Sequence, residues 1–462
     1  MKQRNHATLI AQLQEEYIRR FPRSAGIERR AQKTLIDGSN HLARYYTPFP
    51  FRCTAAQGAY VRDADGHEIL DFWQGHYANI LGHNPPEIAK PLAEALQGRW
   101  GLQTGFPDEL EAEVAALIAA RTGADRVRLT TSGTLATMYA IMLSRSYTGK
   151  KIVLKVGGGW HGGQPWALKG IHPHDGSYEH LESEGLPSQI EGEVWVTRFN
   201  DPQALTDLFR QFGDRLACFI VEPMLGSGGY IAAQPEYLRT ARELTAKYGT
   251  ALILDEIITG FRFHAGNLGA LYGVQPDLMT LGKIVGGGMP LAAVAGRMDI
   301  MRLCSRANGR RVRFDGGTYS AHPAALLASK TMLNHLVAHE KEIYPRLAEL
   351  GEKARQGIER VFAAHGIIAR CTGHGNAAIP GSSLAGVQFP HDTCGEIKYP
   401  DQVWDPALCD VALREQVLKL GLLLRDVNVA LGLGAMSTAH TEADIERLLA
   451  ACDGIAERIV KD

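Results

Sequence analysis

The sequence lacks the features that mark several classes of protein. No stretch reaches the roughly 18 consecutive apolar residues that a membrane-spanning helix needs. Lysine and arginine (49) nearly balance aspartate and glutamate (50), and no basic tract suggests a surface for nucleic acid or anionic lipid. There is no internal repeat and no low-complexity segment. We therefore expect small-molecule partners, with no nucleic acid and no membrane.

Cysteine is sparse and forms no pattern. The seven cysteines are Cys53, Cys218, Cys304, Cys371, Cys394, Cys409 and Cys452. Their odd number and the lack of a C-x-x-C pair argue against both a disulfide framework and a zinc–thiolate site. The N-terminal stretch 1–21 has apolar residues at helical spacing, including Leu9, Leu13 and Ile18, but no unbroken apolar core of signal-peptide type. These features predict an amphipathic helix and a cytoplasmic protein.

What the sequence does contain is typical of an α/β enzyme. Hydrophobic residues make up 45% of its 462 positions, and 50 are glycine. From about residue 108, helix-like pieces alternate with short β-rich runs, which predicts a mainly parallel central sheet. Helices are predicted over 108–123 and 235–249, and strands in the runs RVRLT, KIVLKV, EVWVTRF, LACFIVEP, ALILDEI, DLMTLGK and LAAVAGR.

The predicted division has three parts. They are an N-terminal segment (1–75) with a hairpin turning at Asp65–Gly66, a large domain (76–330) and a C-terminal domain (331–462). We expect both termini to join in the smaller α+β domain.

Polar residues end three of the apolar runs. They are Glu222 in CFIVEP, Asp255 in ALILDEI and Lys283 in DLMTLGKIVGGG. Ligands of such sheets sit at the carboxyl ends of the strands. Asp255 alone could be an ion-pair partner or a helix cap, but Lys283 ends the next buried strand and three glycines follow it closely.

An amine beside a carboxylate suggests the chemistry of pyridoxal 5'-phosphate (PLP). Lys283 would form an imine with the PLP aldehyde, and Asp255 would keep the pyridine nitrogen protonated so that the ring can accept electrons. The phosphate would lie at Ser132, Gly133 and Thr134, where a strand gives way to a helix whose free N–H groups and dipole favour an anion. A plain helix cap is the alternative for these three residues.

The run VGGGWHGG (156–163) spells G-x-G-x-x-G after a strand, as a dinucleotide-binding loop does. Pro165 and further glycines follow, so the helix that such a loop should open is missing. We expect a loop that stacks Trp160 or His161 on a flat ring and closes a pocket, with an ordinary turn as the alternative. His161, His172 and His174 lack companion carboxylates or thiols at ligand spacing, so no metal site is predicted.

These residues resemble those of a known family. DEIITGFRFHAGNLGALYGVQPDLMTLGKIVGGGMPLAAVAGR (255–297), with VEP, SGT, WHG and FDGGTYSAHPAA, is similar to the class III PLP-dependent aminotransferases. Within that family the chain looks most like the branch of glutamate-1-semialdehyde 2,1-aminomutase and β-amino-acid aminotransferases. The likeness extends from about residue 38 to the C-terminal STAHTEADIERLL.

The resemblance implies fold type I architecture and a homodimer with active sites at the subunit interface. It implies that Lys283 forms the Schiff base with PLP and shuttles a proton, and that Asp255 pairs with the pyridine nitrogen. Residues implied to bind the cofactor are Ser132, Gly133, Thr134, Trp160, His161, Glu222, Ser227, Asp255, Ile257, Lys283 and, across the interface, Thr318.

Departures from the family pattern bear on the substrate. Leu135 follows SGT, Ser227 stands where an asparagine is common, Gly432 aligns with a glutamate of the aminomutase, and His76 replaces a tryptophan of its pocket. Arg44 lies where relatives place an arginine that binds a substrate carboxylate, with an ordinary surface arginine as the alternative. Predicted substrate-binding residues are Arg44, His76 and Tyr77, with Arg425 as a second candidate for the carboxylate.

We therefore predict an aminotransferase that moves an amino group between an amino acid or amine donor and a keto or aldehyde acceptor. Intramolecular transfer by a glutamate-1-semialdehyde aminomutase, or racemisation, on the same cofactor is the main alternative. An NAD-dependent oxidoreductase would leave Lys283 unexplained. A non-catalytic binding protein would require that Lys283 forms no imine.

Overall fold

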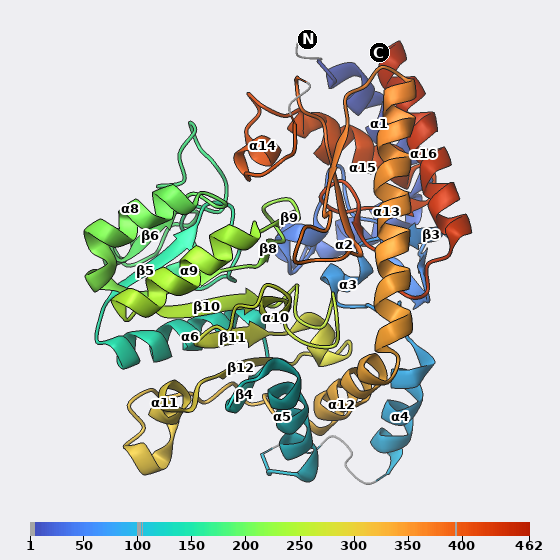
Figure 1. Ribbon diagram of the computed structural model, residues 1–462. Helices are drawn as coiled ribbons and strands as arrows, with labels where there is room; N and C mark the ends of the chain where they lie inside the picture. Colours follow the sequence, from blue (N-terminus) through green and yellow to red (C-terminus); the bar gives the residue numbers. More distant parts are fainter. Residues whose placement is uncertain (1–4, 99–102, 104, 393–394) are drawn as a thin grey trace.

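The computed structural model describes residues 5–98, 103, 105–392 and 395–462, so that Cys394 lies outside the described residues. The described residues form a seven-stranded sheet in the order β4-β12-β11-β10-β7-β5-β6 (Figure 1). Its strands are β4 (Arg126–Thr130), β5 (Ile152–Val156), β6 (Val194–Thr197), β7 (Leu216–Val221), β10 (Ala251–Glu256), β11 (Leu278–Leu281) and β12 (Ala292–Gly296). Each apolar run that the sequence predicts as a strand is one of these.

The sheet is mainly parallel, as predicted. Strands β6, β5, β7, β10 and β11 run in one direction, whereas β12 is antiparallel to both of its neighbours, β11 and β4. Only the ten residues 282–291 join β11 to β12, which is too few for a crossover helix, so the chain reverses there. The carboxyl ends of the parallel strands consequently meet at one edge of the sheet.

Helices cover both faces of this sheet (Figure 1). The apolar side chains of α6 (Gly133–Thr148) pack with those of β7 and β10 on one face. On the opposite face, α8 (Pro202–Phe212) and α9 (Pro235–Tyr248) pack with β5, β7 and β10 in a separate buried cluster. Strands buried on both faces explain the continuous apolar runs in the sequence.

The two predicted helices are confirmed as α5 (Glu109–Thr122) and α9, and Asp108 caps the first of them through the N–H of Glu111. The remaining helices are α1 (Ala7–Arg20), α2 (Pro22–Ala31), α3 (Gln74–Tyr77), α4 (Pro86–Gln97), α7 (Gln189–Glu193), α10 (Leu268–Leu271), α11 (Met298–Met301), α12 (Pro323–Ala338), α13 (Glu340–Ala364), α14 (Asp401–Trp404), α15 (Lys419–Leu423) and α16 (Glu442–Lys461). Among the described residues, no helix is both long and apolar enough to cross a bilayer.

Two smaller sheets lie outside the large one, and the first of them combines segments from both ends of the chain. One consists of β1 (Cys53–Gln57), β2 (Tyr60–Asp63), β3 (Glu68–Asp71) and β15 (Val427–Asn428), and the other of β13 (Arg370–Thr372), β14 (Leu384–Gln388) and β16 (Gly434–Ala435). Strands β8 (Met224–Leu225) and β9 (Ile231–Ala232) form a separate two-stranded sheet. Strands β2 and β3 form the predicted hairpin, and β15 pairs with β3. The predicted boundaries at residues 75 and 330 fall within α3 and α12 and stay a proposal.

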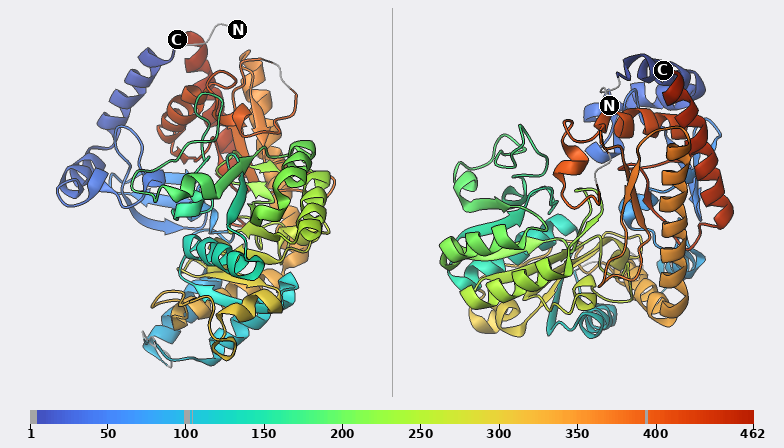
Figure 2. Two further views of the ribbon diagram at one scale, coloured as in Figure 1. Left: turned by 90° about the vertical axis from the view of Figure 1, so that its left-hand side faces the viewer. Right: turned by 45° about the horizontal axis from the view of Figure 1, so that its top comes forward.

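The N-terminal helix α1 lies at the same end of the molecule as α16 (Figure 2), and Arg458 forms a bidentate ion pair with Glu16 between them. As predicted, α1 buries Leu9 and Leu13. Ile18, which the spacing places on the apolar face, is instead 48% exposed. The buried residues of α1 are Leu9, Leu13 and Tyr17, and Ile18 lies about 100° around the helix from Tyr17, to one side of this stripe.

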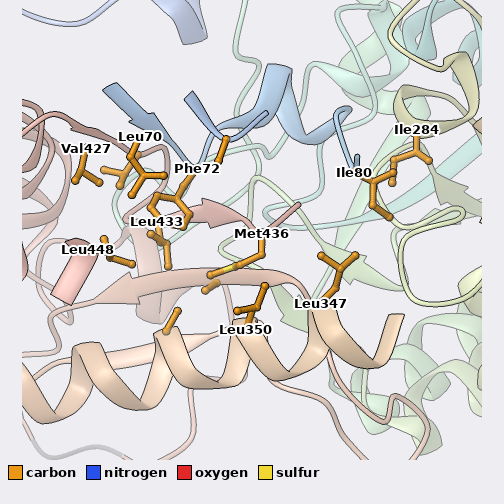
Figure 3. Close-up of a cluster of buried hydrophobic side chains, with 14 of the residues drawn as sticks. Leu70, Phe72, Ile80, Ile284, Leu347, Leu350, Val427, Leu433, Met436 and Leu448 are labelled. Carbon is orange, nitrogen blue, oxygen red and sulfur yellow. The ribbon is translucent and has the colours of Figure 1, made fainter. Parts of the chain in front are cut away.

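A large buried cluster joins the smaller sheets to the turn after β11 (Figure 3). Figure 3 shows Ile284 beside Ile80, and Leu347 and Leu350 of α13 and Met436 belong to the same cluster. Ile284 directly follows Lys283 and is fully buried. The backbone at Lys283 is therefore held by apolar packing at the junction of the two parts of the molecule.

Candidate active site

The carboxyl ends of three neighbouring strands bring Glu222, Asp255 and Lys283 to one cavity of about 260 Å³. Glu222 follows β7, Asp255 lies near the end of β10, and Lys283 begins a short 3₁₀ turn just after β11. Other predicted residues that line the cavity are Ser132, Gly133, Thr134, Trp160, His161 and Ile257. The structure thus gathers most of the predicted cofactor-binding residues around a single space.

Asp255 is almost fully buried, with 3% of its surface exposed, and three donors serve its carboxylate. The Thr280 hydroxyl donates to Oδ1 over 2.9 Å, and the N–H of Ile257 donates to the same atom over 3.2 Å. Thr280 reaches it because β10 and β11 pair in parallel with these two residues in register. Nδ1 of His161 lies 2.7 Å from Oδ2. These bonds compensate the desolvation of the carboxylate and fix its orientation.

His161 supports Asp255 from the glycine-rich loop. Burial lowers the pKa of His161, although the carboxylate of Asp255 acts in the opposite direction. The neutral ring must then carry its proton on Nδ1, because Asp255 can only accept a hydrogen bond. The sequence predicts stacking for this residue, whereas its ring contacts Asp255 edge-on through a nitrogen.

Lys283 lies in a tight turn with left-handed backbone geometry (φ 49°). Gly287, four residues later, also has a positive φ (59°), and a β-carbon there would lie 2.4 Å from the Ala328 carbonyl oxygen of α12. Only glycine permits this close approach of the turn to α12. The glycines after Lys283 thus seat the turn against a helix, while Lys283 itself faces the cavity.

Lys283 is partly buried at the wall of the cavity, and among the described residues no hydrogen bond or ion pair engages its amine. Burial lowers its pKa to about 8, with a smaller contribution from the Arg262 guanidinium, while the carboxylates of Asp255 and Glu222 oppose this change. A lysine with a lowered pKa is a better nucleophile and base at neutral pH than an exposed one. The site is therefore suited to imine chemistry.

Glu222 fastens the glycine-rich loop to the end of β7. Its Oε1 accepts the N–H of Trp160 over 2.9 Å, and its Oε2 accepts the N–H of Gly226 over 3.0 Å. Burial, together with the nearby charge of Asp255, raises the pKa of Glu222 to about 8. Glu222 consequently positions Trp160, whose side chain is 39% exposed at the wall of the cavity.

The predicted phosphate site is the start of helix α6. The Ser132 hydroxyl caps this helix by accepting the N–H of Leu135 over 3.3 Å. Helix geometry leaves the N–H groups of Gly133 and Thr134 without intrahelical acceptors, and the first turn carries no acidic residue. Gly162 packs so closely on Thr134 that a β-carbon there would lie 2.5 Å from the threonine Oγ1. The glycine-rich loop thus closes over an anion-binding helix end.

The chain is similar in sequence and structure to known PLP-dependent enzymes. Residues 41–380 match the family model described as Aminotransferase class-III. Glutamate-1-semialdehyde 2,1-aminomutase from Thermoplasma acidophilum is 35% identical over 327 residues, which cover 71% of this chain and 76% of that protein. An ω-transaminase structure from Sphaerobacter thermophilus is 30% identical with a TM-score of 0.85, covering 94% of this chain and 97% of the other. A β-phenylalanine aminotransferase structure from Variovorax paradoxus is 28% identical with a TM-score of 0.85, covering 97% of both chains.

The chain belongs to the class III aminotransferases. Enzymes of this family depend on PLP, so the predictions of a PLP-dependent enzyme and of fold type I architecture are confirmed. The oxidoreductase alternative fails, and the glycine-rich loop leads into the short 3₁₀ turn Pro165–Ala167 instead of a helix.

The residues of this class III aminotransferase fit PLP on three counts. A carboxylate offers about four acceptor positions. Two hydrogen bonds to Oδ1 and one to Oδ2 occupy three of these positions on Asp255. The fourth acceptor position, on Oδ2, is left for a pyridinium N–H. The unpaired amine of Lys283 faces the same cavity, and the start of α6 offers free N–H groups to a phosphate. Ile257 and Trp160 add an apolar and an aromatic wall.

The predicted substrate residues Arg44 and His76 lie together beside this cavity. Nε of Arg44 donates to Nε2 of His76 over 3.4 Å, and the His76 ring packs on Trp73 with a centroid distance of 4.2 Å. Burial, together with the positive charges of His41, Arg44 and Lys283, lowers the pKa of His76 to about 3. His76 is therefore neutral at physiological pH, and Arg44 supplies the cationic group. Arg44 also lines a second, larger cavity of about 500 Å³.

Tyr77 lies in the core and not in the lining of either cavity. Its ring packs edge-on against Tyr230, and its carbonyl oxygen accepts a hydrogen bond from the buried Arg262 guanidinium. The whole turn from Gln74 to Tyr77 has positive φ angles, which are costly outside glycine. Asp71 stabilises it by accepting the N–H groups of Trp73 and Gln74.

Three further predicted residues lie outside the cavity lining. The Ser227 carbonyl accepts a hydrogen bond from Trp404, and Thr318 is exposed on the surface. The guanidinium of Arg425 donates to the carbonyls of Gly421 and Gly454, which ties it to α15 and α16. Arg425 therefore makes structural bonds, and its suggested role as a carboxylate ligand receives no support from its position.

Sequence reasoning missed Lys155, a fully buried lysine in β5. Its ammonium donates to three carbonyl oxygens that follow along the chain: Gly159 (2.9 Å), Ala167 (3.3 Å) and Lys169 (2.7 Å). A lysine inside the apolar run KIVLKV was the available signal, because a buried ammonium needs several acceptors. Lys155 thus braces the loop that carries Trp160 and His161.

We expect Lys155→Met to destabilise the protein and to loosen this loop. Three buried carbonyl groups would lose their donor, so the free energy of unfolding should fall by about 1–3 kcal/mol. Urea denaturation monitored by circular dichroism would measure this loss, and dialysis would show faster release of the cofactor. Lys151→Met, at an exposed lysine of the same segment, is the matched control. Equal stability of the two variants would contradict the bracing role.

Proposed function

We propose that this enzyme is an intermolecular aminotransferase that moves an amino group from an amino acid or amine donor to a keto or aldehyde acceptor. The observation that carries the proposal is the presence of the Lys283 amine and the Asp255 carboxylate in one cavity, at the ends of adjacent strands. When bound, PLP supplies an aldehyde that forms Schiff bases with amines and a ring that stores the electrons of a broken bond.

Lys283 would hold the cofactor and then, once the donor amine replaces it, move a proton between substrate and cofactor atoms through Nζ. A pKa of about 8 keeps both protonation states of this amine accessible near neutral pH, which suits a group that must act as base and acid in turn. No hydrogen bond among the described residues restrains the amine, so the side chain is free to change partners.

Asp255 would hold the proton of the pyridine nitrogen at the free acceptor position of its Oδ2. Thr280 and His161 keep the carboxylate from rotating, and Glu222 keeps Trp160 at the wall of the cavity. The N–H groups of Gly133 and Thr134 would bind the phosphate.

We also propose a homodimer in which Thr318 reaches the phosphate of the partner subunit's cofactor. The loop that contains Thr318 is exposed and Thr318 is not in the lining of its own cavity, which leaves it accessible to a partner subunit. A cytoplasmic location is part of this proposal, in keeping with the absence of any patterned cysteines.

One observation favours intermolecular transfer over a strict aminomutase reaction. Gly432, which aligns with a glutamate of the aminomutase, has a φ of 88°, and a β-carbon there would lie 2.6 Å from the backbone nitrogen of Val387. No glutamate side chain fits at this position without a backbone shift. The aminomutase named among the relatives nevertheless keeps intramolecular transfer as the second candidate.

The donor or acceptor should carry a carboxylate, because Arg44 places a permanent positive charge beside the cavity. A guanidinium binds a carboxylate through two parallel hydrogen bonds, and the neutral His76 adds no competing charge. We therefore propose amino acids as the principal donors, with Arg44 as the residue that selects them over simple amines.

A half-reaction assay tests the function. The cofactor-loaded enzyme is mixed with single α-amino acids, β-amino acids or amines in the absence of any acceptor, and released carbonyl product is measured by mass spectrometry. We expect about one equivalent of keto product per active site from the true donor, and none with Lys283→Ala. Reaction with glutamate-1-semialdehyde alone, without release of a keto product, would instead establish the aminomutase.

A further inference from the structure

The segment between β5 and β6 contains a cluster of imidazole and carboxylate groups that the catalytic site does not use. In Figure 1 this segment extends above β6 as a long loop. One ligand atom from each of His174, His180 and Glu182 lies within 4.8 Å of the other two. We propose that these three side chains bind a divalent transition-metal ion of the zinc class.

The backbone holds the three residues in place. His174 and Ser177 exchange two hydrogen bonds (2.8 and 2.9 Å), which forms a tight hairpin turn. Farther along, the N–H of Gly170 donates to the His180 carbonyl over 3.2 Å, and the N–H of Glu182 donates to the Leu168 carbonyl over 2.9 Å. His174 therefore faces His180 across the hairpin, and their ring centroids are 3.6 Å apart.

The imidazole of His180 has two buried nitrogens that could bind a metal. Both of its ring nitrogens are shielded from solvent, and neither makes a hydrogen bond within the described part of the chain. Such shielded, unsatisfied nitrogens are costly unless another partner binds them. Nε2 lies 3.3 Å from Oε1 of Glu182. The carboxylate of Glu182 therefore adjoins the His180 ring, and its other oxygen, Oε2, is the atom that would bind the metal.

Glu182 is anchored in the manner of a metal-binding carboxylate. Its Oε1 accepts the N–H groups of Ile171 (3.0 Å) and His172 (2.8 Å), whereas its Oε2 has only the Nδ1 atom of His172 nearby, at 3.7 Å. Hydrogen bonds of this kind orient metal ligands in known sites. Two imidazoles and one carboxylate leave a fourth tetrahedral position for water, and this ligand set suits zinc.

The site was hidden in the sequence because its ligands come from both sides of the hairpin. His174 has no carboxylate at the usual spacing along the chain, and only folding brings His180 and Glu182 to it. Tyr178, at the end of the same hairpin, packs on the backbone of Gly157, where a β-carbon would lie 2.6 Å from its ring. A bound metal would therefore brace the segment next to the loop that carries Trp160.

Zinc titration of the metal-stripped holoenzyme tests the proposal. We expect one equivalent of Zn²⁺ to bind per chain in competition with a chromophoric chelator, and Co²⁺ to give intense visible bands above 500 nm. His180→Ala and Glu182→Gln should weaken binding by at least about 10- to 100-fold. Glutamine still offers an oxygen to the two N–H groups, so Glu182→Gln should leave the hairpin folded.

His374→Ala is the matched control, because His374 lies 3.6 Å from Glu352 in an exposed histidine–glutamate pair elsewhere on the surface. This variant should bind zinc like the wild type. Hydrogen exchange of residues 168–182 should slow on addition of Zn²⁺ in the wild type and in His374→Ala, but not in His180→Ala. Saturation at a stoichiometry other than one, no saturable binding, or equal affinity in His180→Ala and the wild type would each overturn the proposal.

Discussion

Replacement of Lys283 by alanine should abolish turnover, with a fall in kcat of about 10³-fold or more, because it removes both the covalent attachment of PLP and the group that moves the proton. The Lys283 side chain faces the cavity, and the buried Ile284 holds the backbone of the turn. The variant should therefore fold normally. Steady-state kinetics with the donor and acceptor found in the half-reaction assay would measure the loss.

Three observations separate a catalytic role for Lys283 from a structural one. Borohydride should fix PLP to the wild-type chain but not to Lys283→Ala. A small amine such as methylamine should restore part of the activity of the variant, since it can carry the proton in place of Nζ. Lys330→Ala, which removes a surface lysine paired with Glu113, should keep wild-type activity. More than a tenth of the wild-type kcat in Lys283→Ala would contradict the assignment.

The position of Asp255 and Lys283 could be predicted from the sequence because it depends on local patterns. A strand buried on both faces is a continuous apolar run, and the first polar residues after such a run lie at the end of the strand. This reasoning located Glu222, Asp255 and Lys283. Parallel strands then bring their carboxyl ends to one edge, and so to one cavity.

The partners of Asp255 could not be predicted, because they depend on the order and register of the strands. His161 is 94 positions away along the chain and reaches Asp255 from the loop after β5, which is separated from β10 by β7. Thr280 meets Asp255 only because β10 and β11 pair without a shift in register. No pattern within a single segment specifies either of these contacts.

The positions of His76 and Tyr77 depend on left-handed backbone conformations, which most residue types disfavour. His76 and Tyr77 are adjacent, yet the left-handed turn sends one ring toward Arg44 and Lys283 and the other into the core. The turn is stabilised by Asp71, whose own carboxylate also bonds to His83 and Asn428. Residue types alone therefore could not tell which of the two side chains turns toward Arg44 and Lys283.

Asp255→Asn should lower kcat by about 10²- to 10⁴-fold while leaving the fold intact, since asparagine has the same shape but no charge. Without the carboxylate, the ring nitrogen of PLP would lose its proton and the ring would store electrons poorly. The charge of Asp255 also holds up the pKa of Lys283, so removing it should move that pKa below about 8. In a plot of kcat against pH, the fall in rate at high pH that follows deprotonation of the Lys283 amine should therefore move to lower pH.

Thr280→Val is the matched control for this experiment, because it removes a hydrogen bond to Asp255 but keeps the charge. Loss of one neutral donor costs about 0.5–1.5 kcal/mol, so the rate should fall by only about two- to tenfold. If Asp255 acted only as an anchor for Thr280 and His161, the two variants would be similarly impaired. A kcat for Asp255→Asn within tenfold of the wild type, with an unshifted pH profile, would contradict its role at the ring nitrogen.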